Sequence, residues 1–275
     1  MYKIVTDSAA DIFGLETIPF AVVPLTISTD ERTFVDGGIE ADEMVDYLAS
    51  YKGRSYSACP SSDTWREAFG DAKYVFCVAI TSKLSGSYNA ARIAAEDYME
   101  EYPDRRVYVV DTLSAGPGMR ILVNRLEELI LESCSFDEIV DKIEKYKAET
   151  ELLFMLSSVK NFANNGRISP AIAKIVMAMK LRIVGKATEG ELDICDKSRG
   201  EKRGIAAMIA KMEELGYSGG KVLIDHCRNA EGAETLATLI KEKYPSAEIE
   251  IKRTGHLCSF YAEEGGMLMG YEIKK

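Results

Sequence analysis

Short hydrophobic runs alternate along the chain with longer segments in which apolar residues recur at every third or fourth position. Short runs between polar turns are typical of buried strands, and the wider spacing is typical of amphipathic helices. The runs predict strands at 3–6, 21–27, 74–80, 107–110, 152–156, 221–226 and 248–252. The spaced segments predict helices at 41–51, 64–69, 89–102, 118–133, 136–149, 171–179, 200–215 and 231–243.

The alternation of strands and helices indicates an α/β protein with parallel strands. We expect two α/β domains. Residues 1–150 would form a mainly parallel sheet flanked by helices, and residues 151–275 a smaller sheet with its own helices. The charge balance changes at this boundary, because residues 1–150 carry 15 Lys and Arg against 27 Asp and Glu, whereas residues 151–275 carry 19 against 17.

Two of the predicted helices begin with the sequence of a capping box, in which a hydroxyl residue is followed three positions later by Glu or Gln. Thr64 is followed in this way by Glu67, and Ser135 by Glu138. These pairs predict where the two helices begin. Ser61 and Ser62 lie just before the first pair and are alternative caps for that helix.

The chain has a substantial core, since 47% of its 275 residues are hydrophobic, yet no apolar run reaches the length of a membrane span. Its first residues have the pattern of a strand and not of a signal peptide. We therefore expect a cytoplasmic protein without stable membrane insertion.

The net charge of −10 argues against general nucleic-acid binding. One basic cluster stands out at the start of the helix predicted at 200–215, and it consists of Lys197, Arg199, Lys202 and Arg203. The cluster is either a solvated helix face or a docking surface for an acidic partner or a phosphate.

Cysteine and histidine usage argues against a zinc-type site and excludes a His-rich metal site. None of the six cysteines forms a C-x-x-C pair or a zinc-type spacing, and His226 and His256 are the only two histidines. Free buried thiols are the expected state of the cysteines. We expect neither a metal nor a cofactor.

The most informative segment is the hydroxyl-rich turn at 81–87, which lies where a predicted strand ends and a helix begins. At such a joint the free N–H groups and the positive end of the helix dipole favour an anion. The segment lacks the G-x-S-x-G pattern of a nucleophile elbow and the lysine of a phosphate-binding loop. Ser85, Gly86 and Ser87 therefore suit a single carboxylate, with an ordinary serine-capped helix start as the alternative.

Three other loops carry candidate residues. Asp7 and Asp11 follow the first strand and offer carboxylates for acid–base chemistry or simple capping. Ser57 lies too far from the next helix to cap it, which favours a ligand contact. Arg167 follows an Asn-Gly turn and can grip a carboxylate or phosphate with two hydrogen bonds, or be a solvated surface arginine.

The loops and their order resemble those of the DegV family of bacterial fatty-acid-binding proteins. The resemblance runs through nearly the whole chain and rests on six short motifs, each weak alone but specific in this order. The motifs lie at Thr6–Asp11, Ser57–Ser61, Ser82–Tyr88, Val110–Gly116, Gly166–Ser169 and Lys197–Gly200.

The resemblance implies two α/β domains with a long-chain fatty acid between and within them. The carboxylate is then held by hydroxyls and an arginine while the acyl chain lies in an apolar tunnel. Ser57 matches the residue that opens the family's T-S-Q-P-S loop, Ser85 the serine before Gly-Thr, and Arg167 the arginine after the glycine turn. In characterised members a partner kinase phosphorylates the bound acid to an acyl-phosphate, so the binding protein is a carrier and not a catalyst.

The sequence departs from the family pattern in three places. Ala58 and Cys59 replace Ser and Gln in the second loop, and Ser87 replaces the usual Thr. At the C-terminus the family has His-x-Gly-Pro-Gly, but alignment on the glycines at 265–266 leaves no histidine in that place. His256 remains a candidate that would have to fold back towards the head group.

Two other functional classes remain open from the sequence. One is a hydrolase or transferase acting on a small anionic or acyl substrate, with Asp7, Asp11 or His256 as the base. The other is a lipid-sensing regulatory module that docks a partner through the basic cluster at 197–203.

Overall fold

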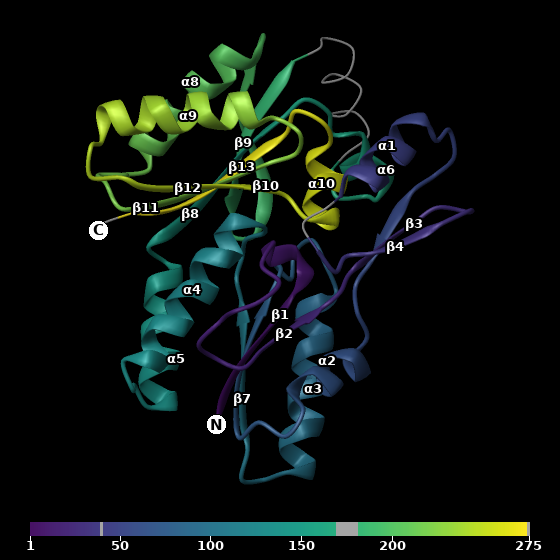
Figure 1. Cartoon of the computed structure of the whole chain (residues 1–275), viewed down its shortest axis with the longest axis vertical. Coiled ribbons are helices and arrows are strands. Elements are labelled where there is room, and N and C mark those ends of the chain that lie inside the picture. Colours follow the sequence, from purple (N-terminus) through teal and green to yellow (C-terminus); the bar gives the residue numbers. More distant parts are fainter. Residues whose placement is uncertain (39–40, 169–180, 274–275) are drawn as a thin grey trace.

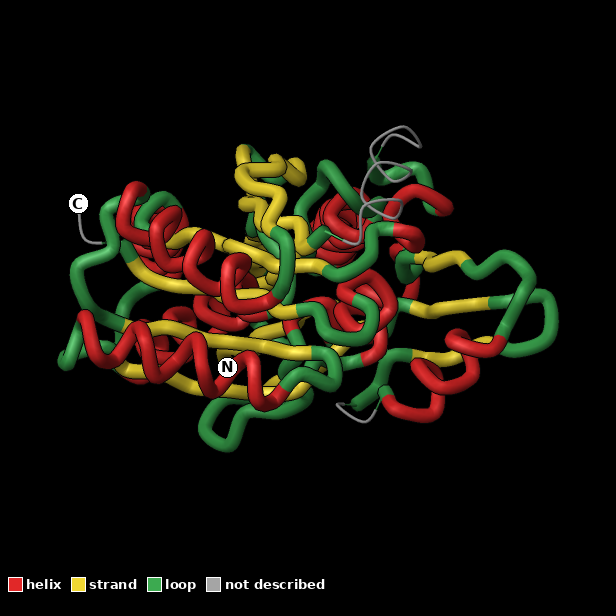
Figure 2. The backbone as a smooth tube through the Cα atoms, turned by 90° about the horizontal axis from the view of Figure 1, so that it is seen from above, coloured by secondary structure: helices red, strands yellow, loops and turns green. Residues whose placement is uncertain are grey.

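The computed structural model describes residues 1–38, 41–168 and 181–273 (Figure 1). The helix predicted at 171–179 and Ser169 lie outside the described residues. Two large sheets lie one above the other in Figure 1, and a small third sheet extends away from them to one side (Figures 1 and 2).

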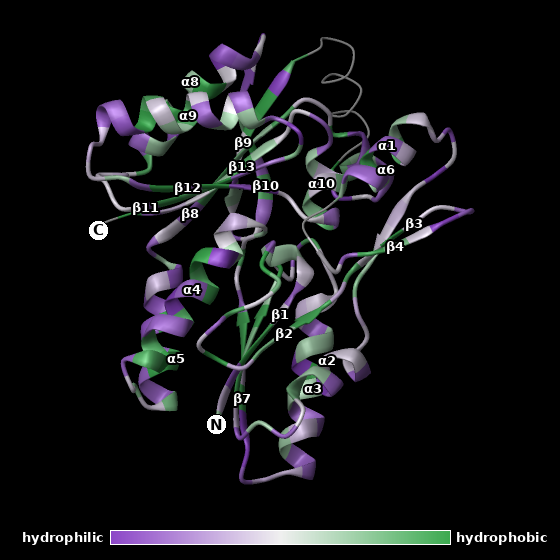
Figure 3. Cartoon of the chain, in the orientation of Figure 1, coloured by the Kyte–Doolittle hydropathy of each residue, from purple (hydrophilic) through white to green (hydrophobic). Residues whose placement is uncertain are grey.

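The first sheet has four parallel strands, as the alternating pattern predicts. Their order is β2 (Phe20–Val23), β1 (Tyr2–Asp7), β6 (Tyr74–Ala79) and β7 (Arg106–Asp111). Helices cover both faces, with α2 (Ser62–Phe69) and α3 (Ser87–Glu101) on one side and α4 (Pro117–Leu131) and α5 (Phe136–Lys147) on the other. Because both faces are covered, the central parts of these strands are hydrophobic, and Figure 3 shows much of them in green.

The strand predicted at 21–27 is divided between two sheets. Pro24 has no N–H to donate to a ladder, and the Leu25 N–H donates to Ser8 Oγ at 2.9 Å instead of to a neighbouring strand. The chain therefore leaves the parallel sheet after β2. It starts a three-stranded antiparallel sheet in the order β4 (Thr33–Val35), β3 (Thr26–Ser28) and β5 (Tyr56–Ala58). Ser57, predicted in a loop, lies on β5.

The sheet of the second half has six strands, so the prediction that it would be the smaller one is wrong. Its order is β10 (Glu191–Ser198), β9 (Arg182–Thr188), β8 (Thr150–Leu156), β13 (Met267–Glu272), β11 (Lys221–His226) and β12 (Glu248–Arg253). Only β11 and β12 pair in parallel. Helices α8 (Glu201–Glu214) and α9 (Ala230–Lys243) pack on one face. The division into two domains at residue 150 stays a prediction.

One predicted capping box is confirmed and the other is wrong. Ser135 and Glu138 form the full reciprocal box at the start of α5. Helix α2, however, begins at Ser62, and Ser61 caps it by accepting a hydrogen bond from the Thr64 N–H at 3.2 Å. Among the described residues, no helix combines the length and apolarity that crossing a bilayer requires.

Four shorter helical elements contact one another around α10 (His256–Ala262), which packs against the 3-10 turn η1 (Ser8–Ala10), α1 (Asp42–Ser50) and α6 (Lys160–Asn164) (Figure 1). Asp36 holds the start of α10, because its two carboxylate oxygens accept hydrogen bonds from the N–H groups of His256 at 3.0 Å and Leu257 at 3.1 Å. This contact satisfies donors that the helix itself leaves free.

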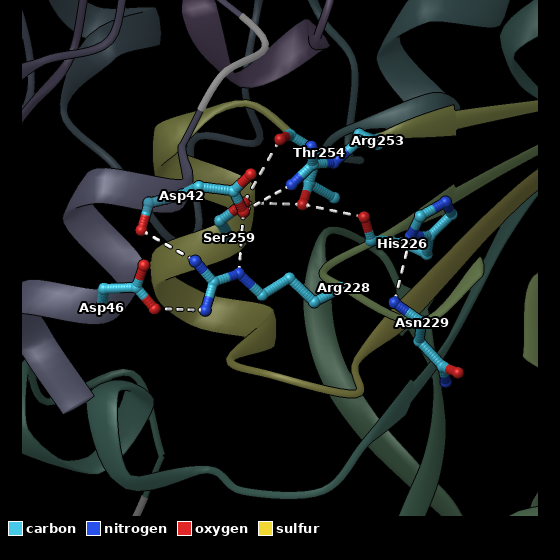
Figure 4. Close-up of polar contacts among 8 residues, drawn as sticks. All are labelled: Asp42, Asp46, His226, Arg228, Asn229, Arg253, Thr254 and Ser259. Carbon is cyan, nitrogen blue, oxygen red and sulfur yellow. Dashed lines mark hydrogen bonds and ion pairs between the residues drawn. The ribbon is translucent and has the colours of Figure 1, made fainter.

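Helix α1 is tied to the second half of the chain by charge (Figure 4). Arg228 Nε donates to Asp42 Oδ1 at 2.7 Å, while its other nitrogens reach the Asp42 carbonyl and Asp46. Arg253 also contacts Asp42. The hydrogen bonds from Arg253 and Arg228 lower the pKa of Asp42 to about 2, so the carboxylate is charged at neutral pH.

Helix α4 lies between the two large sheets and joins them. At its N-terminal end the backbone packs so closely on β13 that a Cβ on Gly270 would lie 2.6 Å from the Pro117 carbonyl carbon. One turn further, Arg120 forms two hydrogen bonds to Asp225 on β11, at 2.7 and 2.6 Å. Both side chains are fully buried, so the charge of each depends on the other.

Replacing Asp225 with Asn leaves the Arg120 guanidinium buried without its counter-charge. We expect the free energy of unfolding to fall by about 3 kcal/mol or more. The matched control is Asp137→Asn, which breaks the exposed pair with Arg106 and should change stability little. Denaturant unfolding of the two variants measures this, and equal small losses would contradict the bridging role of Arg120.

Candidate functional site

An apolar cavity of about 290 Å³ lies where the C-terminal edge of the parallel sheet meets the six-stranded sheet and α10. Most of its wall is aliphatic or aromatic, including Leu152, Phe154, Leu156, Phe162, Leu257 and Leu268. The loops after the parallel strands close one side, as expected for ligand sites in α/β sheets. A cavity with such walls suits a hydrocarbon ligand.

Polar groups of the wall come from four distant segments. Ser57, Ser85, Arg167 and Tyr261 line the same cavity. The Ser57 and Tyr261 hydroxyl oxygens lie 2.7 Å apart. Ser57 and Arg167 also line an open hollow on the outside, so the polar groups lie at the mouth of the cavity.

Arg167 is held by backbone carbonyls, and no carboxylate of a described residue pairs with it. Gly166 before it has a φ of 73°, which confirms the predicted positive-φ turn. The Arg167 Nε–H donates to the Leu84 carbonyl at 3.2 Å, and one terminal nitrogen donates to the Asn165 carbonyl. A guanidinium has five N–H donors, so three of them have no partner among the described residues and can serve a ligand.

Asn165 aligns the two sides of this mouth, a role that the sequence analysis missed. Its Oδ1 accepts a hydrogen bond from the Ser57 N–H at 3.2 Å, and its Nδ2 donates to the carbonyls of Ser55 at 3.3 Å and Asn161 at 2.9 Å. Its own carbonyl accepts from Arg167. Asn165 therefore fixes the position of Ser57 relative to Arg167, through its side chain on one side and its backbone carbonyl on the other.

Tyr261 was also missed, because nothing in its local sequence distinguishes it from a core aromatic residue. It packs against Phe162 with ring centroids 4.6 Å apart. Burial raises the pKa of its hydroxyl, and the hydrogen bond from Ser57 and the charge of Arg167 oppose that shift only in part. The hydroxyl therefore keeps its proton at neutral pH and can donate it to an anion.

The strand–turn–helix joint has the predicted form, since β6 ends at Ala79 and α3 begins at Ser87. Gly86 is the N-cap residue of α3, and no side chain caps this end. The Ser85 hydroxyl accepts a hydrogen bond from the Ser87 N–H at 3.2 Å. Ser85 and Gly86 line the cavity, and the positive end of α3 lies beside it.

The model of the DegV family, described as "Uncharacterised protein, DegV family", matches residues 1–273. The chain belongs to the DegV family. A DegV domain-containing protein of Streptococcus pneumoniae is 42% identical over 278 residues, which cover 99% of each chain. Another from Streptococcus gordonii is 41% identical over the same length, again covering 99% of each chain.

Two solved DegV structures are very similar to this one. A DegV family protein from Eubacterium eligens, loaded with heptadecanoic acid, has a TM-score of 0.96 at 40% identity and covers 100% of both chains. The Fatty Acid Kinase B3 protein of Streptococcus pneumoniae, loaded with linoleic acid, has a TM-score of 0.97 at 41% identity and covers 99% of both. The α/β fold implied by the resemblance is thereby confirmed.

Two of the predicted site residues do not line the cavity. Ser87 is buried, and its hydroxyl donates to Asp7 Oδ2 at 2.6 Å. His256 lies at the start of α10, where its Nδ1 is 3.3 Å from the Gly38 carbonyl and 3.4 Å from Asp36 Oδ1. The hydrogen bond to Asp36 raises the pKa of His256.

Asp7 and Asp11 are buried structural acids at the sheet edge. Asp7 accepts hydrogen bonds from Ser87, the Ile80 N–H at 3.0 Å and the Ala9 N–H at 3.2 Å, and the last contact caps η1. Asp11 Oδ1 accepts from the Gly255 N–H at 2.9 Å. Neither lines the cavity, and the described residues contain no group of three potential ligands able to hold a metal ion.

Burial raises the pKa of Asp7 from 3.8 to about 7, against the opposing effect of its three hydrogen bonds. The folded protein therefore binds this proton more tightly than the unfolded chain. Its contribution to stability is full below pH 3.8 and is lost as the pH rises to about 7.

Replacing Asp7 with Asn should remove this pH dependence. Relative to the wild type, we expect Asp7→Asn to gain about 1 kcal/mol or more in free energy of unfolding between pH 5 and pH 8. Denaturant titrations at both pH values measure the change. A stability difference that is the same at pH 5 and pH 8 would show that Asp7 is ionised throughout.

Proposed function

We propose that this protein binds a long-chain fatty acid, with the acyl chain in the apolar cavity and the carboxylate at its mouth. The observation that supports this most is the cavity itself, in which a hydrocarbon wall is combined with three hydroxyls and an arginine. The similar structures from Eubacterium eligens and Streptococcus pneumoniae hold heptadecanoic and linoleic acid.

The acyl chain would supply most of the affinity, since each buried CH₂ contributes about 0.8 kcal/mol. The carboxylate would otherwise lose its hydration at a large cost. Arg167 offers three N–H groups that have no partner among the residues the structure describes. The hydroxyls of Ser57, Ser85 and Tyr261 offer further donors. Tyr261 would take the role of the family's histidine, while Ser87 and His256 would act on structure alone.

The proposed role is that of a carrier and not of a catalyst. The neighbour from Streptococcus pneumoniae is a protein of a fatty acid kinase, so we propose that a kinase partner phosphorylates the acid bound here. A hydrolase or transferase has less support, because Asp7 and Asp11 are buried away from the cavity. The basic cluster of Lys197, Arg199, Lys202 and Arg203 is exposed and remains the surface for a partner in the lipid-sensing alternative.

Replacing Arg167 with Ala should weaken binding of palmitic acid about tenfold to a hundredfold, the effect of losing a charge-assisted hydrogen bond. Hexadecanol, which has no charge, should lose about threefold or less. Displacement of a fluorescent lipid probe measures both affinities. Arg92→Ala is the control, because this arginine is exposed on α3 and paired with Glu96. Equal losses for acid and alcohol would contradict the head-group role.

A further inference from the structure

An open hollow of about 700 Å³ lies directly outside the mouth of the cavity. It is formed by the chain around β5 and by the turn after α6. The hollow and the cavity share Ser57 and Arg167, so a group attached to the head of a bound lipid would project into the hollow.

The hollow is positively charged in a protein whose net charge is −10. Among the described residues, its charged lining residues are Arg54 and Arg167, and none of its described lining residues is acidic. Neither arginine forms an ion pair with any residue that the structure describes, whereas Arg228 and Arg253 are both paired with aspartates. Two arginines without ion-pair partners beside the same hollow favour the binding of an anion there.

Arg54 is exposed, but a hydrogen bond holds its side chain in place. One of its terminal nitrogens donates to the Asn164 carbonyl at 3.1 Å, which fixes the guanidinium against the turn that carries Arg167. Tyr56 and Asn164 add polar groups to the same wall. The remaining N–H groups of Arg54 have no partner in the described part of the chain, so they can bind oxygen atoms of a ligand. A planar guanidinium matches a phosphate with two parallel hydrogen bonds.

We propose that this hollow binds the phosphoryl group of an acyl-phosphate, with Arg54 as its phosphate-binding residue. The inference rests on the proposed function, because the acyl chain must occupy the cavity. In the reaction a carboxylate oxygen of the bound acid attacks the γ-phosphorus of a nucleoside triphosphate brought by the kinase partner. The new bond joins that oxygen to phosphorus, and the bond to the β-phosphate oxygen breaks.

The electron pair of the broken bond leaves with the nucleoside diphosphate, and no proton moves because the carboxylate is already ionised. The product has three terminal oxygens and more negative charge where the acid had two oxygens. Of the two arginines, only Arg167 serves the acid, whereas the product places its phosphoryl group in the hollow beside Arg54. The two arginines thus separate recognition of the acid from recognition of the product.

The test compares two ligands of matched chain length, palmitic acid and 2-oxoheptadecylphosphonate, a hydrolysis-resistant analogue of palmitoyl phosphate. We expect Arg54→Gln to weaken the phosphonate about tenfold, as for loss of one charge-assisted contact, and to leave the acid within about twofold. Arg92→Gln is the control and should change neither. Displacement of a fluorescent lipid probe gives both affinities.

Several outcomes would overturn the proposal. If the wild type binds both ligands and Arg54→Gln binds the phosphonate with unchanged affinity, the proposed phosphoryl site is wrong. The proposed function would still stand. Equal weakening of acid and phosphonate assigns Arg54 a structural role. If the wild type binds neither ligand, the proposed function itself is overturned. A separate calorimetric experiment measures the binding of inorganic phosphate alone. If this binding occurs and depends on Arg54, the hollow is assigned to a free anion.

Discussion

The fold depends on a buried ion pair between Arg120 on α4 and Asp225 on β11. Two charges without access to water are stable only in contact, so the pair fixes how α4 lies on the six-stranded sheet. The parallel sheet packs on the other side of α4. The close contact of Gly270 with Pro117 permits this arrangement, since a side chain there would push the helix away. The cavity between the sheets follows from this junction.

The cavity has the two properties that the proposed carriage of a fatty acid would require. Its apolar wall would remove the hydrocarbon from water, and its mouth would provide donors for a carboxylate that cannot be left unsatisfied. The donors come from segments far apart in sequence, and the side chain of Asn165 links two of them. Arg167 is satisfied by carbonyls, which keeps its charge available for a ligand. The open hollow beyond provides room for chemistry at the head group.

The parts of this site that are local in sequence could be predicted. The strand–turn–helix joint at Ser85 and Gly86 and the turn before Arg167 follow from residue types within a few positions. The role of Tyr261 could not be predicted, because its partner Ser57 is distant in sequence. The helix that carries it, α10, is held in place by Asp36 from another segment. Ser87 has a hydroxyl that could bind a carboxylate ligand, but tertiary packing directs this hydroxyl to Asp7.

The distinction between local sequence signals and contacts made only in the folded chain also explains which strands could be predicted. The continuous hydrophobic runs of the parallel strands gave a clear signal, since both of their faces are buried. The hairpin of β9 and β10 was missed because β10 is largely exposed and carries charges along its length. Strand β13 was missed because its hydrophobic run contains Gly270, a residue that weakens a strand pattern but here permits the contact with α4.

The most direct test of the central claim is to identify what the protein carries. Mass spectrometry of the protein under native conditions, followed by extraction and analysis of the released lipid, should show one long-chain fatty acid per chain. Delipidated protein should take up one added fatty acid in the same measurement. Protein that carries no lipid when freshly purified, and takes up none when a fatty acid is added, would contradict the account.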